Sequence, residues 1–466
     1  MDEVRYQEAL DYLYSFIDYS IERSFRYSPE LFDLSRLSDL LAKLGNPHTQ
    51  FPSVHIAGTK GKGSVGAFIE SCLRSAGLRT GLYTSPHLQR FTERIRVNGS
   101  EIEKQELIDL VDEIKDIVPQ VPDLTTYELI TAIGFLYFAR LEIDIAVVEV
   151  GLGGRLDGTN VIKPLTSVIT SISYDHMHLL GNSLSDIARE KAGIIKEDIP
   201  VVSSPQQYEV EVVLKEQARQ KNAPFLLVGR DWLFAAQEHS LAGQSFFLWS
   251  AEEQAMMNAY IETGDNSGWS PARFETSLLG YHQISNAVTA YAALKEIEKA
   301  GFQIEEDAIR EGFRNTVWPG RFQVLSRTPI LVVDCAHNRE SALKLRIALD
   351  DYFPGQNVTL IFGASEDKDI AGILAELMPR VSRVVLTQAV HPRAASPEFL
   401  TEFTRTYGRV VESISPVSAA LEDVMKSIAK DDVVLATGSL FVAGEILAHW
   451  GELQQTKDSI LSSEEP

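Results

Sequence analysis

Apolar residues follow two patterns along the chain: short unbroken runs, and repeats at steps of three and four. Residues 7–45 carry the second pattern twice and predict two helices, the second ending at Gly45 and Pro47. Beyond them, apolar runs typical of buried strands alternate with helical repeats. The runs lie at 54–57, 79–83, 145–150, 166–172 and 200–202, and the helices at 65–76, 104–117, 125–140 and from 183 or 185 onward. This alternation predicts an α/β domain in which helices cover both faces of a parallel sheet.

The pattern changes between residues 230 and 280. Two short strand candidates, 245–249 and 274–279, are separated there by polar stretches that contain Gly and Asn. Such a pattern predicts an antiparallel hairpin region, whose function the sequence leaves open. A long helix over 282–300 and a shorter one before Trp318 follow.

A second alternating series begins at Ile330. Apolar runs at 330–334, 358–365, 383–387 and 432–438 predict the strands of a second α/β domain, with helices between them. The Pro319–Gly320 pair interrupts the pattern before this series and marks the boundary. We therefore predict a first domain over 1–317, a linker over 318–322, a C-terminal domain over 323–460 and a disordered acidic tail over 461–466.

Length and charge narrow the class of protein. The 466 residues exceed what one hydrophobic core usually supports, which agrees with two domains. The net charge of −22 argues against nucleic acid or an anionic membrane as the main partner. The N-terminus has no signal-peptide core, no apolar run reaches the length of a membrane span, and the cysteines are only Cys72 and Cys335. We expect a cytoplasmic protein with reduced thiols.

The segment His55–Ser64, read HIAGTKGKGS, connects a predicted strand to a predicted helix. In such a loop, backbone N–H groups and the helix N-terminus hold phosphate, and a lysine reaches the outer phosphates. The spacing is shorter than in the usual Walker A loop, and Gly63 separates the lysine from the serine. The alternative is an ordinary glycine-rich turn. We interpret the segment as a nucleotide loop made of Gly58, Thr59, Lys60, Gly61, Lys62, Gly63 and Ser64.

Further polar residues follow predicted strands, at the edge where open α/β sheets bind ligands. They are Ser85, Glu149, Asp175 with His176, and Lys191 slightly further on. A hydroxyl, a carboxylate and an imidazole beside a phosphate loop indicate Mg²⁺ shared with nucleotide oxygens, although imidazole is an uncommon Mg²⁺ ligand. Each also has a structural alternative: a turn cap for Ser85, an ion pair for Glu149 and a core position for His176.

The loop GLGGRLDGTN after residue 150 resembles a dinucleotide fingerprint only superficially. Its glycines, at 151, 153, 154 and 158, lack the required third position, and a strand follows. We interpret it as a ligand-facing loop that carries Arg155 and Asp157.

Many of these segments occur together in one known family. In order, they are HIAGTKGKGS, TSPHLQRFTERIRVNG, TTYELITA, EVGLGGRLDGTN, SYDHMHLLG, REKAGIIK, WPGRFQ, DCAHN, GASEDKD, HPRAA and GSLF. Over residues 8 to 450 the chain resembles folylpolyglutamate synthases and dihydrofolate synthases of the Mur ligase superfamily. The resemblance implies a large P-loop ATPase domain, a smaller Rossmann-like domain, and catalysis between them. It also implies ATP and Mg²⁺ as cofactors, and a monomer that activates a folate or dihydropteroate carboxylate as an acyl phosphate for attack by L-glutamate.

The resemblance also implies roles for individual residues. Asn286, Arg321 and Asp334 join the loop in contacting ATP, and Ser85, Glu149 and His176 are the metal ligands. Lys191 matches a lysine that becomes a carbamate, and Lys62, Lys191 and His337 are catalytic. His337 and Ser439 handle glutamate. The pterin side comprises Phe32, Asp33, Leu34, Thr125, Thr126, Tyr127, Glu128, Leu156, Asp157 and Gly158.

The chain departs from the family pattern at Lys60, where Asn is usual, at Gly158, where Ala is common, and at Cys335, where Gly is usual. Two other functions remain open at this point: a Mur-type ligase acting on a cell-wall precursor, and a nucleotide-binding regulator without catalysis. We expect both dihydrofolate synthase and folylpolyglutamate synthase activity. We expect the Asp157 carboxylate to accept pterin N–H groups, so that Asp157→Ala lowers the dihydrofolate synthase activity more than the other; the alternative is that Asp157 caps its own loop.

Overall fold

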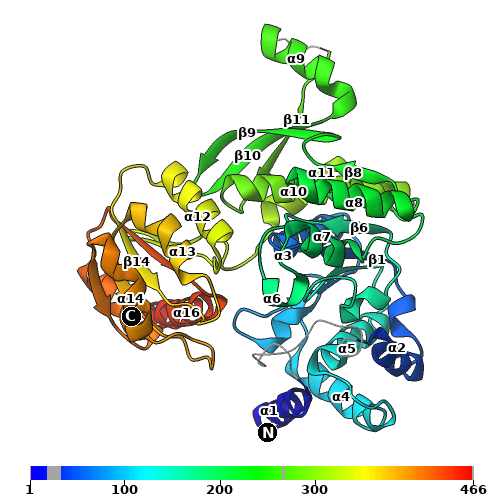
Figure 1. Ribbon diagram of the computed structural model, residues 1–466, viewed down its shortest axis with the longest axis horizontal. Coiled ribbons are helices and arrows are strands. Elements are labelled where there is room, and N and C mark those ends of the chain that lie inside the picture. Colours follow the sequence, from blue (N-terminus) through cyan, green and yellow to red (C-terminus); the bar gives the residue numbers. More distant parts are fainter. Residues whose placement is uncertain (1, 18–32, 265–267, 464–466) are drawn as a thin grey trace.

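The computed structural model describes residues 2–17, 33–264 and 268–463. It contains two large α/β parts, and a smaller antiparallel sheet extends across both (Figure 1). This arrangement confirms the predicted fold class. Within the described ranges, no helix combines the length and the apolar character needed to cross a bilayer.

The N-terminal part is built on an eight-stranded sheet. Its strands, in spatial order, are β4 (Ser100–Glu101), β3 (Ile95–Val97), β2 (Thr80–Tyr83), β5 (Ile145–Glu149), β1 (Ser53–Ala57), β6 (Thr166–Ile169), β7 (Val201–Ser203) and β8 (Phe225–Leu227). All neighbours pair in parallel except at β3 and β4. The carboxyl ends of β1, β2, β5 and β6 therefore meet at one edge of the sheet.

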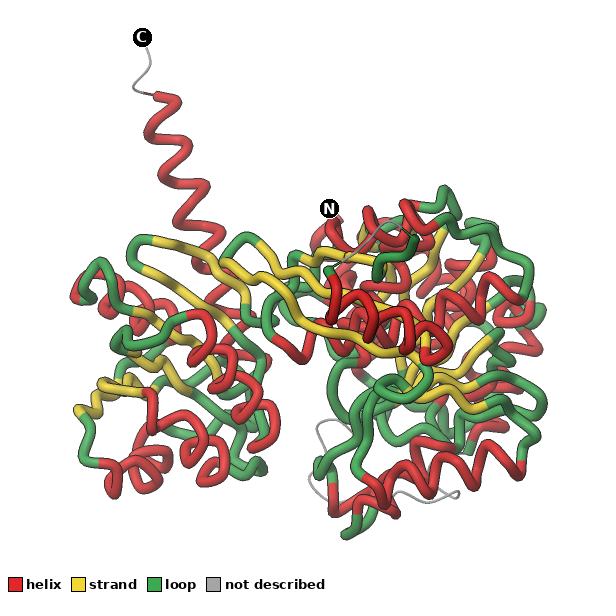
Figure 2. The backbone as a smooth tube through the Cα atoms, turned by 90° about the horizontal axis from the view of Figure 1, so that it is seen from above, coloured by secondary structure: helices red, strands yellow, loops and turns green. Residues whose placement is uncertain are grey.

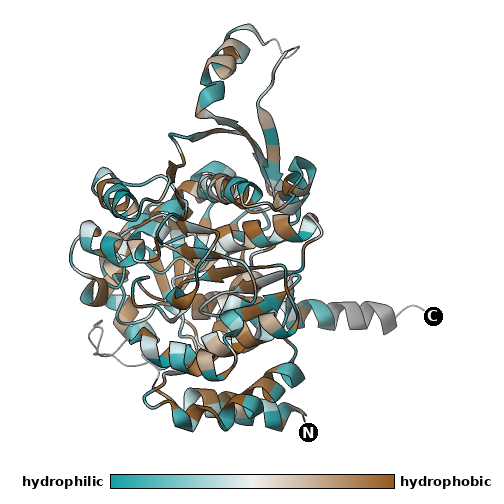
Figure 3. Ribbon diagram, turned by 90° about the vertical axis from the view of Figure 1, so that its right-hand side faces the viewer, coloured by the Kyte–Doolittle hydropathy of each residue, from teal (hydrophilic) through white to brown (hydrophobic). Residues whose placement is uncertain are grey.

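Helices cover both faces of this sheet, because alternate strand residues point to opposite sides. The helices are α1 (Asp2–Tyr14), α2 (Leu34–Lys43), α3 (Lys62–Ser75), α4 (Lys104–Lys115), α5 (Thr126–Arg140), α6 (Met177–Leu180), α7 (Leu184–Ala192), α8 (Tyr208–Gln220), α10 (Tyr281–Lys299) and α11 (Glu306–Asn315). In β5, Val148 packs toward the core with α4 and α5, and Val147 packs toward the core with α3, α10 and α11. Figure 3 shows the apolar residues concentrated in the interior.

The C-terminal part has a six-stranded sheet. Its strands, in order, are β12 (Gln323–Arg327), β13 (Ile330–Val333), β17 (Val433–Thr437), β14 (Val358–Phe362), β15 (Val381–Leu386) and β16 (Val410–Ser413), and only β12 is antiparallel. Its helices are α12 (Arg339–Tyr352), α13 (Ile370–Leu377), α14 (Pro397–Thr404), α15 (Val417–Ser427) and α16 (Leu440–Ser463). Helix α16 continues to Ser463, within the expected tail, and residues 464–466 lie outside the described residues (Figure 2).

A three-stranded antiparallel sheet extends over both parts; we call it the bridging sheet. It consists of β9 (Trp232–Ser240), β10 (Gly243–Ser250) and β11 (Ala272–Thr276). The antiparallel pairing of β10 with β11 confirms the predicted hairpin region, whereas β9 was not predicted. Phe246 packs in the N-terminal core, whereas Leu241 packs against the C-terminal core and its carbonyl accepts a hydrogen bond from Arg327 at 3.4 Å. Helix α9 (Gln254–Thr263) projects from this sheet (Figure 1) and was not predicted, because of its residues only Met257 is buried and the apolar pattern is weak.

Short 3₁₀ helices complete the described chain. They are η1 (Pro47–Thr49), η2 (Phe91–Arg94), η3 (Val118–Gln120), η4 (Gly158–Val161), η5 (Ala251–Glu253), η6 (Met378–Arg380) and η7 (Arg405–Tyr407). Cys72 and Cys335 are both free and buried, as expected of reduced thiols.

Candidate active site

A cavity of about 1820 Å³ opens at the carboxyl ends of the N-terminal strands and is also lined by residues of the C-terminal part. Most of the predicted site residues line it. They are the loop Gly58–Ser64, Ser85, Thr125, Thr126, Tyr127, Glu128, Glu149, Leu156, Asp157, Gly158, His176, Lys191, Asn286, Arg321, Asp334, His337 and Ser439, with Leu34 at the entrance from α2. Residues far apart in the sequence are thus brought to one site, although the role of each remains a prediction.

The loop after β1 has a conformation that suits a phosphate. Gly58 (φ +154°) and Gly61 (φ +92°) lie in the region that favours glycine. A Cβ on Gly58 would stand 1.8 Å from Oγ1 of Thr170, and one on Gly61 would stand 2.6 Å from Oδ1 of Asn286. Only glycine allows these close approaches. Helix α3 begins directly afterwards at Lys62, so its first N–H groups point into the cavity without intrahelical acceptors.

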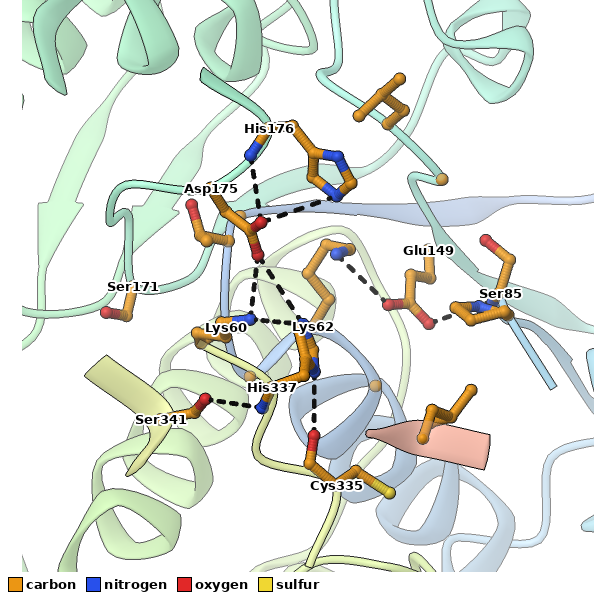
Figure 4. A pocket seen from close by; sticks show the side chains of 18 of the residues that line it. Lys60, Lys62, Ser85, Glu149, Ser171, Asp175, His176, Cys335, His337 and Ser341 are labelled. Carbon is orange, nitrogen blue, oxygen red and sulfur yellow. Dashed lines mark hydrogen bonds and ion pairs between the residues drawn. The ribbon is translucent and has the colours of Figure 1, made fainter. Parts of the chain in front are cut away.

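Glu149 ends β5 beside this loop (Figure 4). Its carboxylate lies 3.6 Å from Nζ of Lys62 and accepts a hydrogen bond from the Ser85 backbone at 3.4 Å. Burial raises the pKa of Glu149, although the Lys62 ammonium opposes that shift. A further cation would stabilise the charged form of such a buried carboxylate.

The predicted metal ligands are only partly assembled. The Ser85 backbone is hydrogen-bonded to Glu149, whereas the His176 side chain is 42% exposed and its Nε2 lies 3.8 Å from the Asp175 carboxylate. Among the residues the structure describes, no three His, Cys, Asp or Glu side chains gather as a metal site. One hydroxyl and one carboxylate beside a phosphate loop still suit Mg²⁺, which takes few protein ligands and completes its shell with phosphate oxygens and water.

The Lys191 side chain extends from α7 to the first residue of the loop Gly58–Ser64. It is 4% exposed, and Nζ donates a hydrogen bond of 2.9 Å to the Gly58 carbonyl. Burial, reinforced by the nearby Lys62 charge, lowers the pKa of Lys191 to about 7. A large fraction of this side chain is therefore a neutral amine at neutral pH, which is the form that reacts with CO₂.

Asp175 joins the two parts of the molecule. Its carboxylate accepts hydrogen bonds from Lys60 at 3.0 Å and, across the cavity, from Lys368 at 3.3 Å and Asn338 at 3.4 Å. Burial alone would raise the pKa of Asp175, but the nearby His337 ring and the ammonium groups of Lys60 and Lys368 lower it. Asp175 is therefore an anion held by cations from both sides.

His337 lies next to this cluster, just before α12. Its Nδ1 is 2.9 Å from the Cys335 carbonyl, and its Nε2 is 2.8 Å from Nζ of Lys60 (Figure 4). The Lys60 charge, followed by burial, lowers the pKa of His337 to about 4. Its backbone N–H donates to Oγ of Ser341 at 3.2 Å, so the imidazole is held on both ring nitrogens and at its backbone.

On the expected pterin side, Asp157 is occupied by its own loop. The carboxylate accepts hydrogen bonds from the backbone of Gly151 at 3.0 Å, Leu152 at 2.9 Å and Thr159 at 3.0 Å, and from the Tyr127 hydroxyl at 3.3 Å. These contacts favour the loop-capping interpretation over direct pterin recognition. Arg155, expected to face the ligand, instead pairs with Glu190 at 2.9 Å and is absent from the cavity lining.

Two residues of the predicted pterin set are not brought to the cavity. Asp33 is exposed and caps α2, accepting hydrogen bonds from the Ser35 backbone at 2.9 Å and hydroxyl at 2.8 Å. Its short polar side chain before an apolar helix is the usual signal of a cap, and that signal explains its position. Phe32 lies outside the described residues.

The remaining predicted contacts have local structural partners as well. Asp334 accepts hydrogen bonds from the backbones of Phe322 and Ala336, both at 2.8 Å, and burial raises its pKa. Asn286 donates to Gln283 at 2.9 Å, and Ser439 accepts from the Val442 backbone at 3.1 Å. Arg321 lies beside Asp334 and Cys335 on the segment that leads into the C-terminal sheet.

Sequence reasoning missed some residues of the site. Lys368 and Asn338 were not assigned, and Asp175 was noticed only as the neighbour of His176. Lys368 follows β14, so the strand-end rule that identified Glu149 also points to it. Nothing in the sequence shows that Lys368 and Asp175, 193 positions apart, meet across the cavity.

Two regions of the chain match Mur ligase domains. Residues 56–294 match the Mur ligase middle domain, and residues 320–440 match the Mur ligase glutamate ligase domain. Dihydrofolate synthase/folylpolyglutamate synthase of Bacillus subtilis is 33% identical over 452 residues, covering 95% of this chain and 98% of that protein. Folylpolyglutamate synthase of Lacticaseibacillus casei is 33% identical over 422 residues, covering 89% and 93%.

Solved structures share the fold over nearly the whole chain. Mycobacterium tuberculosis folylpolyglutamate synthase complexed with ADP has a TM-score of 0.83 at 30% identity and covers 97% of this chain and 99% of its own. Escherichia coli FolC in complex with DHPP and ADP has a TM-score of 0.79 at 29% identity, covering 96% and 98%. With its phosphate loop and its cavity between two α/β parts, this chain belongs to the folylpolyglutamate synthase and dihydrofolate synthase family of ATP-dependent Mur ligases.

Proposed function

We propose that the protein joins L-glutamate to the carboxylate of dihydropteroate or a folate through an acyl phosphate, using ATP and Mg²⁺. The observation that carries the proposal is the meeting, in one cavity, of the nucleotide loop with His337 and Lys368 of the other part. The acyl phosphate formed from ATP and the attacking glutamate amine have to meet in the same cavity, where the amine displaces phosphate. A regulator without catalysis has no use for this juxtaposition, and the curated relatives favour folates over cell-wall precursors.

In the proposed reaction, the loop and the first N–H groups of α3 hold the ATP phosphates, and Lys62 neutralises the charge that develops on the transferred phosphoryl group. Bound Mg²⁺, held by Ser85, Glu149 and phosphate oxygens, supplies further charge neutralisation. Lys191 supports this edge of the site as a carbamate, whose negative charge suits a metal. Because little covalent chemistry falls to the protein, its main contribution is to position the reactants.

The amine of glutamate has to lose a proton before it attacks. His337, whose ring is held at Nδ1 and Nε2, is the proposed group on the glutamate side, together with Ser439. The proposal also places the protein in the cytoplasm as a monomer without a membrane or nucleic-acid partner. Its test is the release of phosphate, which must require both a folate substrate and L-glutamate.

Both family activities are expected in the wild-type protein. Phosphate release measured in parallel with dihydropteroate and with tetrahydrofolate, each with and without glutamate, checks this expectation. A protein inert toward dihydropteroate is monofunctional and contradicts it. Release without glutamate indicates an ATPase and not a ligase.

Asp157→Ala is expected to lower both activities together and to reduce stability. The change leaves five donors without this acceptor, namely three backbone N–H groups and the hydroxyls of Tyr127 and Thr159, and each donor left unsatisfied in a buried position costs roughly 1–3 kcal/mol. The assays above and thermal unfolding measure the effects. Asp33→Ala, which removes only an exposed helix cap, is the control and is expected to change both activities and the thermal midpoint only slightly. A loss of activity with dihydropteroate alone would support direct recognition of the pterin by Asp157.

Bound substrates are expected to draw the two parts closer together. Ligands that contact both the nucleotide loop and His337 stabilise the closed arrangement, and Pro319–Gly320 is the chain connection at which the parts turn. Small-angle scattering with an ATP analogue, folate and glutamate measures the change in dimensions. Identical profiles with and without ligands argue against closure.

A further inference from the structure

The contact between Lys60 and His337 joins the nucleotide loop to the segment before α12. Nζ of Lys60 lies 2.8 Å from Nε2 of His337 and 3.0 Å from Oδ2 of Asp175. The same carboxylate oxygen is 3.7 Å from Nε2 of His337. The lysine ammonium is thus placed between an imidazole and a carboxylate that would otherwise face each other directly.

The hydrogen bonds define the form of the imidazole. The Cys335 carbonyl, 2.9 Å from Nδ1, only accepts hydrogen bonds, so Nδ1 carries a proton. The Lys60 ammonium only donates, so Nε2 receives its hydrogen bond with a lone pair. Both contacts are satisfied by the neutral Nδ1–H tautomer, and an imidazolium would place two N–H donors against each other at Nε2.

The charges around the ring decide what happens without Lys60. The charged groups that face His337 are Lys60 from the loop after β1, Asp175 from the loop after β6 and Lys368 from the loop after β14. Asp175 favours a protonated ring, and the two lysines oppose it. Lys368 contacts the other carboxylate oxygen, Oδ1, at 3.3 Å, so of the two lysines Lys60 is the one bonded to the ring.

We propose that Lys60 is a positioning residue that keeps His337 as a neutral imidazole, by occupying the place at Nε2 where Asp175 would otherwise hold a proton. This inference rests on the proposed function, in which His337 acts on the glutamate side. It explains why Lys60, in place of the usual Asn, matters in this chain. The neutral amide of Asn could not balance the negative charge of Asp175 beside His337. The lowered pKa of His337 agrees with it.

Nitrogen-15 NMR of histidine-labelled protein tests the proposal without any substrate. The chain has 10 histidines, and His337→Gln identifies the relevant signals by their loss. In wild-type protein we expect the Nδ1–H form at neutral pH, with protonation only near pH 4. In Lys60→Met and Lys60→Asn we expect protonation within about one unit of the ordinary histidine value of about 6.5. Lys60→Arg is expected to keep the neutral form.

Lys368→Met is the matched control, since it also removes one ammonium from Asp175 but leaves the contact at Nε2 intact. It is expected to shift the protonation of His337 by less than half as much as Lys60→Met. Equal shifts in the two variants overturn the proposal, as does a wild-type His337 that is already charged at pH 7. Lys60→Met and Lys60→Asn both remove the charge at position 60, so the test can still be made if one of them does not fold.

Kinetics separate this role from a simple contact with ATP. Protonation of His337 in Lys60→Met lowers kcat/KM for glutamate at pH 5.5 by roughly tenfold and moves the acidic limb of the profile to higher pH, whereas loss of a phosphate contact raises KM for ATP alone. A change confined to KM for ATP, with His337 still neutral by NMR, overturns the proposal. If wild-type protein forms no product at all, the proposed function fails, while the NMR result still decides the state of His337.

Discussion

Lys62→Ala is expected to leave the protein folded and to remove almost all glutamate-dependent phosphate release. The side chain points into the cavity and not into a core, and its contact is the Glu149 carboxylate at 3.6 Å. In the proposed reaction, its charge meets the transferred phosphoryl group, and removing one such group is expected to raise the barrier by roughly 3–4 kcal/mol, about a hundredfold or more in rate. Steady-state assays with both folate substrates measure the loss.

The stability of Lys62→Ala distinguishes a catalytic effect from misfolding. Glu149 lies at the edge of the cavity, where it can take up a proton or water once the lysine is gone, so we expect a small change in thermal midpoint. Lys196→Ala is the control, because Lys196 bonds to the Asn160 carbonyl at 2.8 Å away from the cavity. Turnover near the wild-type rate in Lys62→Ala contradicts the assignment of this loop to the nucleotide.

The second large effect is expected at Lys191. With a pKa of about 7, this lysine is about half neutral at pH 7 and becomes more reactive toward CO₂ as the pH rises. We expect a carbamate on Nζ in crystals grown with ATP, Mg²⁺ and bicarbonate. Lys191→Ala is expected to lose activity by roughly a hundredfold, since it removes one charged group from the phosphate site, and a small carboxylate added to the assay is expected to restore part of it.

Lys196 is also the matched control for this prediction. Burial lowers its pKa to about 8, so it too offers a neutral amine, but it lies outside the cavity. Carbon-13 bicarbonate is expected to label wild-type and Lys196→Ala protein equally and to leave Lys191→Ala without the signal. An unmodified Lys191 in the complete complex, still bonded to the Gly58 carbonyl, contradicts the prediction.

Periodicity predicted the buried strands and the long helices well. Both faces of β1 and β5 are covered, so these strands read as unbroken apolar runs in the sequence. It missed strands at sheet margins, such as β4 with two residues and the exposed β16, because a partly solvated edge leaves no apolar run. Helix α9 was missed for the same reason, as its helical face is not buried.

Site residues were predictable where a polar residue or a glycine-rich loop at the end of a strand stands out from its apolar neighbours. Glu149 is conspicuous because a carboxylate interrupts an apolar run, and the glycine loop is conspicuous by its composition. The partners of these groups were not predictable from local patterns. That Asp175 meets cations of both parts follows from how the loops after β1, β6 and β14 are placed relative to one another.

The bridging sheet has a consequence for how the molecule unfolds. Its β10 residue Phe246 is part of the core shared with α3, while His239 on β9 contacts the Tyr352 ring of α12 at 4.8 Å between centroids. Melting either large part therefore strips apolar contacts from this sheet and weakens the other part. Although the chain has separate hydrophobic cores on either side of the cavity, calorimetry should record one cooperative unfolding transition in place of two. Substitutions that disrupt the bridging sheet should divide this transition into two.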